Sequence, residues 1–297
     1  STEGIKDFFK QSKTIRYQYA TLYALRLFIS AKGRIEHIRE SLYTEAETDL
    51  RLSGEKQFDY VNPSNREVQI EMERACTEHL KSINAWLAPN EYTEYTEDQS
   101  AYPVEASVII PVRNRVRTIK DAIHSALSQK ADFDYNVIVI DNHSTDGTAE
   151  AVASFNNDKR VVLLQPERTD LGIGGCWDFA VRSEHCGRYA VQLDSDDLYS
   201  SPSTLQQIVN AFHQQRAAMV IGSYRMVNFD LQTLPPGLIA HNEWTAENGR
   251  NNALRINGLG APRAFRTDIL RQIGFPNTSY GEDYALGLTI SRHRRKI

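Results

Sequence analysis

Cysteine is scarce in this chain, and the few cysteines are scattered. Three occur among 297 residues, at positions 76, 176 and 186, and no two of them form a C-x-x-C pair. Disulfide frameworks need an even set of cysteines, and structural zinc sites need clustered thiolate or imidazole ligands. The sequence therefore argues against both and favours a reducing compartment, which we expect to be the cytoplasm.

A long hydrophobic run is also missing. The most apolar early stretch, Thr21 to Ala31, has eleven residues and contains Arg26. A helix that crosses a bilayer needs about 20 apolar residues, and a secretory signal peptide has a different context. We therefore expect neither a membrane span nor a signal peptide in this stretch.

Basic charge is not in excess either. The chain has 34 lysines and arginines against 38 aspartates and glutamates, a formal net charge of −4. Proteins that bind nucleic acid usually carry a basic field, so nucleic acid is not an expected partner. The basic cluster Arg292 to Lys296, "RHRRK", has two interpretations. It is a surface for an anionic polymer or for peripheral association with the inner face of a membrane, or a solvated helix end that suits the helix dipole.

The chain is rich in hydrophobic residues, and their spacing follows two different patterns. Hydrophobic residues make up 41% of the sequence, enough for one large domain or two ordinary ones. In the first part, apolar positions recur with helical spacing between Tyr17 and Ala31 and again between Val68 and Ile83. The acidic stretch Glu91 to Ser100 has no core pattern. We therefore predict an α-helical N-terminal region over residues 1–98 and a second domain over residues 99–297.

After residue 100, short β-branched runs alternate with amphipathic segments of helix length. The runs are Ala106 to Val112, Tyr135 to Asp141, Arg160 to Pro166 and Arg188 to Asp194, and the predicted helices are Ile119 to Leu127, Thr148 to Phe155 and Trp177 to Ser183. This alternation indicates βαβ units and an α/β fold with a mostly parallel, Rossmann-like sheet covered on both faces. Such sheets bind ligands at the carboxyl ends of their strands.

Three carboxylates follow the fourth run, in "LDSDDLYS". Asp194 and Asp196 are two residues apart, so in extended chain their side chains point the same way, while Asp197 points elsewhere. Two convergent carboxylates together with substrate phosphates suit Mg²⁺ or Mn²⁺. The alternative is a solvated acidic cap for the helix that begins near Pro202.

The second run ends in "DNHSTDGT". Asp141 stands at the carboxyl end of this predicted strand, where a carboxylate can accept hydrogen bonds from a nucleobase or a ribose. We expect structural roles for Ser144 and Asp146, as caps of the next helix. The later "DLGIGG" lacks the third glycine of a dinucleotide-binding loop, so a tight turn that leads into a helix explains it.

A last acidic pair lies in "NTSYGEDY". Ser279 and Glu282 have the spacing of a capping box, which gives Glu282 a structural role. Asp283 is not explained by that box. The dipole of a helix favours the charged form of a carboxylate in its first turn, and a general base must be charged at neutral pH.

Taken together and in this order, the motifs resemble those of family 2 glycosyltransferases, which are inverting enzymes of the GT-A fold. The resemblance covers approximately residues 101–297 and leaves out the helical region before them. It rests on five segments: "SVIIPVRN" (Ser107 to Asn114), "IDNHSTDGT" (Ile140 to Thr148), "DLGIGGCWD" (Asp170 to Asp178), "LDSDD" (Leu193 to Asp197) and "GEDY" (Gly281 to Tyr284).

The resemblance implies a nucleotide-sugar donor, expected to be a UDP-sugar, and a carbohydrate or glycolipid acceptor, as in polysaccharide biosynthesis. It also implies a divalent cation, Mg²⁺ or Mn²⁺, on the donor diphosphate. The residues that it assigns are Pro111, Arg113, Asp141, Asp194 and Ser195 to the nucleotide-sugar, Asp194 and Asp196 to the metal, and Asp283 to the general base. The parts are chemically coherent, because the metal offsets charge on the leaving diphosphate while the base removes the acceptor proton.

Some positions depart from the family pattern. Asn142 and His143 replace an Asp-Gly pair, which is expected to alter nucleobase contacts, and Trp177 and Asp178 stand where Arg-Asn is common. Family members also continue beyond the "ED" pair and often add a histidine metal ligand. Either His293 takes that role, or we expect the chain to be a fragment that lacks part of its site.

Two other functions fit parts of the pattern. Nucleotidyl transfer also uses paired aspartates on α/β sheets, but its loop after the first strand is expected to contain glycine, and "PVRNRVRT" has only the arginines. The other alternative is a non-catalytic nucleotide-sugar-binding or scaffold module that retains the fold with a degraded site. Trp177, Asp178 and the short C-terminal part motivate that alternative.

Overall fold

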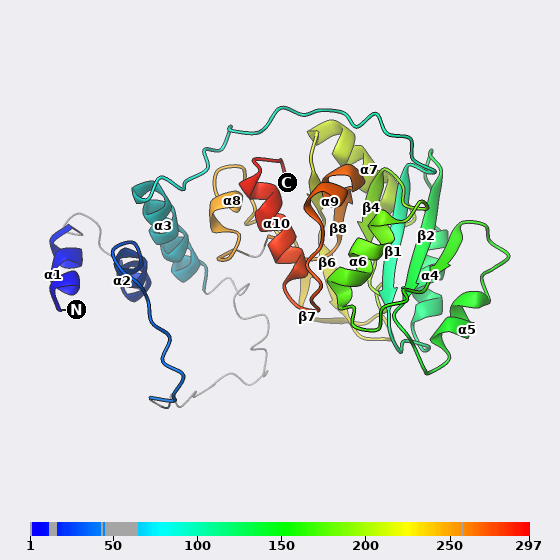
Figure 1. Cartoon of the computed structure of the whole chain (residues 1–297), viewed down its shortest axis with the longest axis horizontal. Coiled ribbons are helices and arrows are strands. Elements are labelled where there is room, and N and C mark those ends of the chain that lie inside the picture. The colour runs from blue at the N-terminus through cyan, green and yellow to red at the C-terminus, as the bar shows by residue number, and fades with distance from the viewer. Residues whose placement is uncertain (1, 12–16, 43, 45–64, 257) are drawn as a thin grey trace. The chain divides into compact units, whose positions relative to one another are not determined.

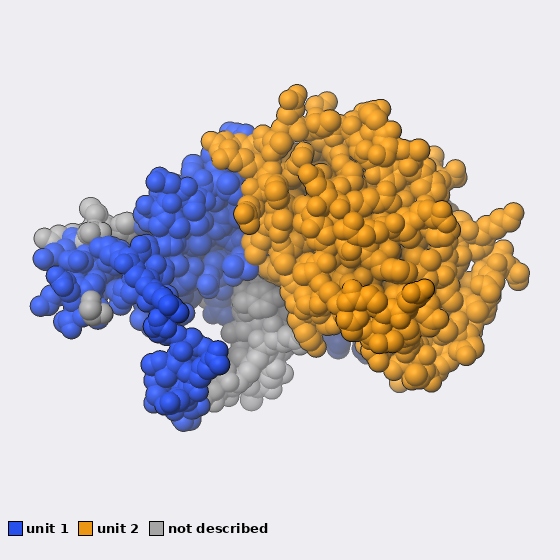
Figure 2. All heavy atoms as spheres, in the orientation of Figure 1, with its two compact units in different colours: residues 1–90, 225–258 blue, residues 91–224, 259–297 orange. Residues whose placement is uncertain are grey.

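The computed structural model describes residues 2–11, 17–42, 44, 65–256 and 258–297 (Figure 1). The chain forms two compact units (Figure 2). One comprises residues 1–90 and 225–258, and the other comprises residues 91–224 and 259–297. The sequence pattern did not separate residues 225–258 from the second domain, and the predicted limits at residues 98 and 99 stay a prediction.

The second unit contains a six-stranded sheet in the order β3-β2-β1-β4-β8-β5. Its strands are β1 (Ala106–Val112), β2 (Tyr135–Asp141), β3 (Val161–Leu164), β4 (Tyr189–Gln192), β5 (Met219–Ile221) and β8 (Arg263–Arg266). Strand β1 runs parallel to β2 and β4, and β2 runs parallel to β3, whereas β8 is antiparallel to both β4 and β5. The predicted α/β fold with a mostly parallel sheet is confirmed.

Different helices cover the two faces of this sheet. On one face the core includes alternate strand residues, among them Val108, Ile110, Val137 and Val139. The helices that complete this core are α4 (Ile119–Leu127), α5 (Thr148–Ala153) and α7 (Thr204–Gln215). The intervening Ile109 is also fully buried and points to the other face, because side chains alternate along a strand.

On that other face, α6 (Ile173–Arg182) packs against β1 and β2. Two further helices, α9 (Thr267–Ile273) and α10 (Glu282–Arg292), pack against α6. Helix α10 therefore reaches the sheet through α6, which places its first turn near the carboxyl edge.

The strand order creates a crevice at one point of that edge. The chain passes from β1 to β2 and β3 on one side and then returns to place β4 on the other side of β1. Loops at the carboxyl ends of β1 and β4 thus diverge, and such a switch point is where open α/β sheets bind ligands. The turn that begins with Asp194 lies here, two residues beyond the end of β4.

The predicted elements differ from the observed ones mainly at their ends. The first two runs form β1 and β2 over the predicted residues, while the third and fourth are shorter and end at Leu164 and Gln192. Helix α6 begins at Ile173, four residues before the predicted start. Strands β5 and β8 were not predicted, because three or four residues with arginine at both ends of β8 carry too little apolar pattern.

The first unit is helical, as predicted, with an added strand pair. Its helices are α1 (Thr2–Gln11), α2 (Thr21–Ser30), α3 (Arg66–Ser82) and α8 (Gly249–Asn252), and β6 (Tyr224–Val227) pairs with β7 (Thr233–Ile239). The Asn251 side chain accepts the Leu87 N–H at 2.9 Å and donates to the Leu87 carbonyl at 2.8 Å. These two bonds explain how residues 225–258 join the N-terminal helices.

The basic cluster near the end of the chain is partly engaged within the second unit. Arg294 forms an ion pair with Glu91 at 2.9 Å, and the Lys296 ammonium donates to the Gln215 side chain at 2.8 Å. These contacts agree with a helix-end role, and membrane association stays a prediction. Across the described part of the chain, none of the helices combines the length and apolarity needed to cross a bilayer.

A side chain of α3 holds the segment that leads into α2. The Glu71 carboxylate accepts the backbone N–H groups of Gln18, Tyr19 and Ala20 at 2.9, 2.6 and 3.0 Å. These donors, the Gln18 N–H foremost, lower the pKa of Glu71. The stabilisation is therefore present above the unfolded-state pKa of the carboxyl and is lost as the pH falls through the lowered folded-state pKa.

We predict that Glu71→Gln loosens the start of α2, because an amide offers one uncharged acceptor oxygen to donors that now share a carboxylate. Limited proteolysis at pH 7 should cleave near residues 17–21 several-fold faster than in the wild type. The matched control is Glu67→Gln, which removes an exposed carboxylate from the first turn of α3. Equal cleavage rates in the Glu71 variant and the wild type would contradict the prediction.

Candidate active site

Two of the assigned nucleotide-binding residues lie at the end of β1, next to Asp141. Asp141 pairs with Val112 in register, which places its carboxylate beside Pro111 and Arg113 at the edge of the sheet. Asp141 is 1% exposed and accepts the Ser144 N–H at 3.1 Å and the Gln165 amide at 3.3 Å. Arg113 is exposed. The structure thus brings Pro111, Arg113 and Asp141 to one edge, as the sequence predicts.

The loop after β1 is fastened to the loop after β2. The Asn114 N–H donates to the Ser144 hydroxyl at 2.9 Å, and the Val116 N–H donates to the Asp146 carboxylate at 3.1 Å. Ser144 and Asp146 therefore have structural roles, as expected, although they link two loops in addition to the Asp146 bond to the Thr148 N–H at the start of α5. This fastening fixes the arginine-bearing loop at the edge of the sheet.

The departures Asn142 and His143 also fasten loops. The Asn142 amide donates to the Leu171 carbonyl at 2.8 Å, and the His143 ring nitrogen lies 3.0 Å from the Arg168 carbonyl oxygen. His143 has φ +57°, a conformation that the family's glycine adopts without strain. Both side chains thus hold the segment before α6 against the Asp141 edge.

The acidic turn after β4 has cationic and amide partners. The Gln192 amide donates to Asp194 at 2.8 Å, and Arg115 lies 3.6 Å from Asp196. Desolvation by the surrounding turn, followed by the charges of Asp194 and Asp196, raises the pKa of Asp197 to about 6. The turn therefore carries a concentration of negative charge that Arg115 offsets only in part.

Asp283 lies in the first turn of α10, against β8. Its carboxylate forms an ion pair with Arg263 and accepts the Tyr284 N–H at 2.7 Å. The N-cap of α10 is Gly281 at φ +75°, with no side-chain cap bond. The capping box predicted for Ser279 and Glu282 is therefore wrong, because a left-handed N-cap does not aim the Ser279 hydroxyl at the helix.

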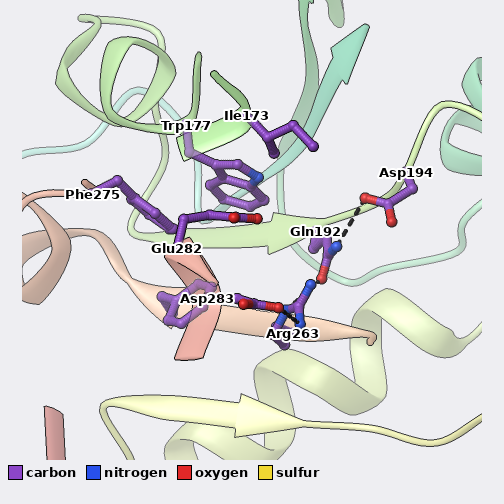
Figure 3. Close-up of a pocket in the computed structure, with 9 residues that line it drawn as sticks. Ile173, Trp177, Gln192, Asp194, Arg263, Phe275, Glu282 and Asp283 are labelled. Atoms are coloured by element: carbon purple, nitrogen blue, oxygen red, sulfur yellow. Dashed lines mark hydrogen bonds and ion pairs between the residues drawn. The ribbon is translucent and has the colours of Figure 1, made fainter. Parts of the chain in front are cut away.

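Asp194 and Asp283 line one pocket (Figure 3). The apolar lining is Ile173, Trp177, Phe265 and Phe275, and the polar lining is Gln192, Asp194, Arg263, Glu282 and Asp283. The Trp177 ring stacks on Phe275 with 5.3 Å between ring centroids. The pocket therefore combines an aromatic wall with three carboxylates and one guanidinium.

Glu282 is the most buried of these carboxylates. It is 8% exposed, and its Oε2 atom has no hydrogen-bond partner among the described residues. Burial, and then the neighbouring charge of Asp283, raises its pKa above the ordinary value. A buried acceptor without a partner is costly, so this oxygen is suited to a hydroxyl group that enters the pocket.

The donor set suits a hard divalent cation. Asp194 and Asp196 offer carboxylate oxygens, the ligands that Mg²⁺ and Mn²⁺ prefer when substrate phosphates supply the remainder. In the residues with described positions, no group of three or more His, Cys, Asp or Glu side chains could hold a metal alone. His293 follows α10, whose eleven residues rise about 15 Å, so it lies far from Asp283 at the start of that helix.

Sequence reasoning missed several pocket residues. Arg263 and Gln192 meet because β8 pairs with β4, and the four residues of β8 carry no strand pattern. Trp177 departs from the family pattern, but nothing in the sequence indicates its stack on Phe275. The capping-box spacing gives Glu282 a structural role, whereas its position beside Asp283 is the signal that points to the pocket.

An α/β sheet in this order, with acidic side chains at its switch point, is the architecture of GT-A glycosyltransferases. Comparison with known proteins agrees: the family model described as glycosyl transferase family 2 matches residues 107–274, more than half of the chain. The chain therefore belongs to glycosyl transferase family 2.

Curated relatives share part of the chain. An uncharacterized glycosyltransferase of Rickettsia felis is 32% identical over 101 residues, which cover 34% of this chain and 16% of that protein. The poly(ribitol-phosphate) beta-N-acetylglucosaminyltransferase TarS of Staphylococcus aureus is 26% identical over 175 residues, which cover 57% of this chain and 29% of TarS. The chain thus spans less than a third of the length of these relatives.

Two solved structures resemble the fold with a TM-score of 0.50 each. S. aureus TarS 1-349 in complex with UDP-GlcNAc is 24% identical, and the match covers 62% of this chain and 52% of that one. The mannosyltransferase PcManGT from Pyrobaculum calidifontis, in complex with GDP-Man and Mn²⁺, is 19% identical, with coverage of 79% and 64%. At these identities the likeness shows the GT-A fold.

The glycine-containing "DLGIGG" segment owes its composition to close packing. A Cβ atom at Gly174 would overlap the Pro276 carbonyl oxygen and lie 2.9 Å from the Glu282 Cβ atom. A Cβ atom at Gly172 would lie 2.6 Å from the Thr278 carbonyl carbon. These glycines let the start of α6 touch the segment that leads to Asp283.

We predict that Gly174→Ala destabilises the protein by about 1–3 kcal/mol, the usual cost of overpacking a tight contact. Thermal unfolding should show a lower Tm than that of the wild type. Gly33→Ala is the matched control, because a Cβ atom there meets nothing within 4 Å. An unchanged Tm for the Gly174 variant would mean that residues 276–278 move aside freely.

Proposed function

We propose that this protein transfers a sugar, with inversion, from a nucleotide-sugar donor to an acceptor hydroxyl in a metal-dependent reaction. The observation that carries the proposal is the shared pocket of Asp194 and Asp283 at the switch point of the sheet. One carboxylate belongs to the candidate metal site and the other to the candidate base. Direct displacement needs both at opposite ends of the reacting sugar.

The donor nucleotide is proposed to lie along the edge formed by Pro111, Arg113 and Asp141, with Ser195 beside the ribose. The buried Asp141 carboxylate supports this placement, because its bonds to the Ser144 N–H and the Gln165 amide leave acceptor capacity for a base or ribose donor. We expect a UDP-sugar. TarS was crystallised with UDP-GlcNAc and PcManGT with GDP-Man and Mn²⁺, which supports a nucleotide-sugar and leaves the base to experiment.

Asp194 and Asp196 are the residues that would hold the cation. When bound, Mg²⁺ or Mn²⁺ supplies positive charge that stabilises the leaving nucleoside diphosphate. Arg115, already 3.6 Å from Asp196, is placed to add a second positive charge at the same turn.

Asp283 is proposed to act as the general base. The acceptor oxygen forms a bond to the anomeric carbon as its proton passes to the Asp283 carboxylate, and the bond from that carbon to the diphosphate oxygen breaks. Asp283 lies in the first turn of α10, and its carboxylate lines the pocket. The products are the glycoside with inverted configuration and a nucleoside diphosphate.

The remaining pocket residues are suited to the sugar itself. Trp177 and Phe275 present an aromatic wall of the kind that packs against the apolar face of a sugar ring, and the unpartnered Glu282 oxygen can accept a hydroxyl hydrogen. The acceptor is proposed to be a carbohydrate or glycolipid hydroxyl. A position at the inner face of a membrane stays an expectation from the basic C-terminal cluster.

We predict that nucleotide binding depends on the cation and on Asp196. Calorimetry with UDP and GDP should show binding in the presence of Mn²⁺ that weakens more than about tenfold in Asp196→Asn, since even indirect partners of metal ligands contribute about 10–100-fold. Asp121→Asn, an exposed carboxylate on α4, should bind as the wild type does. Absence of binding to the wild type with either Mg²⁺ or Mn²⁺ would contradict the proposal.

We also predict that Asp283→Asn lowers kcat by about 10²–10⁴-fold, the usual contribution of a general base. Metal-dependent nucleotide binding should persist, which shows that the variant folds. Product analysis of the wild type should find a nucleoside diphosphate and an inverted anomer. Release of pyrophosphate would instead indicate nucleotidyl transfer.

A further inference from the structure

A continuous chain of polar contacts joins the candidate metal site to the candidate base. The Gln192 amide nitrogen donates to Asp194 at 2.8 Å, and the Arg263 Nε atom donates to the Gln192 amide oxygen at 2.9 Å. Arg263 Nη1 then contacts Asp283 (Figure 3) and donates to the Leu259 carbonyl at 2.9 Å. Asp194 and Asp283, which belong to different motifs, are thus linked through the neutral Gln192 and the cationic Arg263.

The direction of this chain is fixed by chemistry. Arginine only donates hydrogen bonds, so the Gln192 oxygen must face Arg263, and a carboxylate only accepts, so the Gln192 amino group must face Asp194. A flip of the Gln192 amide would break both bonds at once. The position of Arg263 therefore determines which end of Gln192 meets the acidic turn.

This chain of polar contacts is also shielded from water. Gln192 is 5% exposed, and the Arg263 and Asp283 side chains are 13% and 20% exposed. Partners lost in such a setting are not readily replaced by solvent, which makes each contact consequential. Burial thus makes the arrangement of Arg263 matter for both carboxylates.

The backbone explains why these residues meet. Strands β4 and β8 are antiparallel, with Val191 opposite Ala264, so Gln192 at the end of β4 adjoins Arg263 at the start of β8. A planar guanidinium can serve Gln192, Leu259 and Asp283 from fixed directions, whereas a lysine ammonium offers one point charge. The sheet therefore holds the group that fixes both carboxylates.

We propose that Arg263 is a positioning residue that sets the orientation of the base Asp283 and, through Gln192, of the metal-site carboxylate Asp194. This inference rests on the proposed function. Arg263 acts through the two carboxylates and does not itself take part in bond making. Donor binding and the chemical step are then coupled through one side chain.

The proposal predicts a different effect for each substitution that removes one of these polar contacts. Gln192→Met removes the amide that joins Arg263 to Asp194 and leaves the Arg263–Asp283 ion pair in place. It should weaken Mn²⁺-dependent nucleotide binding about tenfold, as expected for one hydrogen bond to a charged group, with little change in kcat at saturation. Arg263→Lys keeps a cation beside Asp283 but loses the fork, so it should weaken binding to a similar extent. Arg263→Gln should weaken binding and also lower kcat.

The test measures calorimetric affinity for UDP or GDP with Mn²⁺, whichever the wild type binds, together with kcat and KM for nucleoside diphosphate release from the matching nucleotide-sugar. The binding losses of Gln192→Met and Arg263→Gln should not add in the double variant, because both cut the same branch. The matched control is Arg266→Gln, which breaks an arginine–carboxylate pair with Asp268 at the other end of β8. It should lower Tm without changing affinity or kcat.

Each result bears on the inference. Additive losses, or losses that only follow Tm as in the Arg266 control, would reduce Arg263 to a structural ion pair and overturn the inference while the proposed function stands. A wild type that binds no nucleotide with metal, or releases no nucleoside diphosphate, would overturn the proposed function and this inference with it. Separate effects on affinity and kcat with non-additive binding losses would support it.

Discussion

The parallel pairing of β4 with β1 is the constraint on which the site depends. Ile109 pairs with Gln192, so the last residue of β4 lies beside β1 while the longer β1 continues toward Asp141. The acidic turn after β4 is thereby brought beside the edge that carries Asp141, where Asp196 meets Arg115 of the loop after β1. On its other side β4 pairs with β8, which delivers Arg263. The four-residue strand β4 thus lies between β1 on one side and β8, which carries Arg263, on the other.

The parts of the fold that could be predicted are the strands in which nearly every residue is buried. Strands β1 and β2 are fully buried or nearly so, and their β-branched runs admit no other element, so their bounds agree with the prediction. Asp141 and Asp194 could be predicted with them, because the end of a recognisable strand fixes the place of the residue that follows. Asp283 could be assigned only through the resemblance to a family.

The other pocket residues could not be predicted, and the reasons are physical. Arg263 owes its position to strand β8, which is stabilised by pairing on both sides and not by its own sequence. The sequence spacing of Ser279 and Glu282 predicts a capping box, but the left-handed Gly281 is the N-cap instead. Spacing alone does not reveal the backbone conformation of an N-cap. Trp177 depends on a stack with Phe275, almost a hundred residues away in sequence. Long-range pairing decides the positions of Arg263 and Trp177, and the backbone conformation of the N-cap decides that of Glu282.

The glycines at the start of α6 limit where this enzyme can vary. Because Gly172 and Gly174 lie against backbone atoms of Pro276 and Thr278, packing against α6 fixes the path of the chain that leads to Glu282. Tyr280, two residues after Thr278, is 92% exposed and lies outside these contacts. Substitution therefore meets least restriction at Tyr280, while the left-handed Gly281 after it and the packed segment before it tolerate little change.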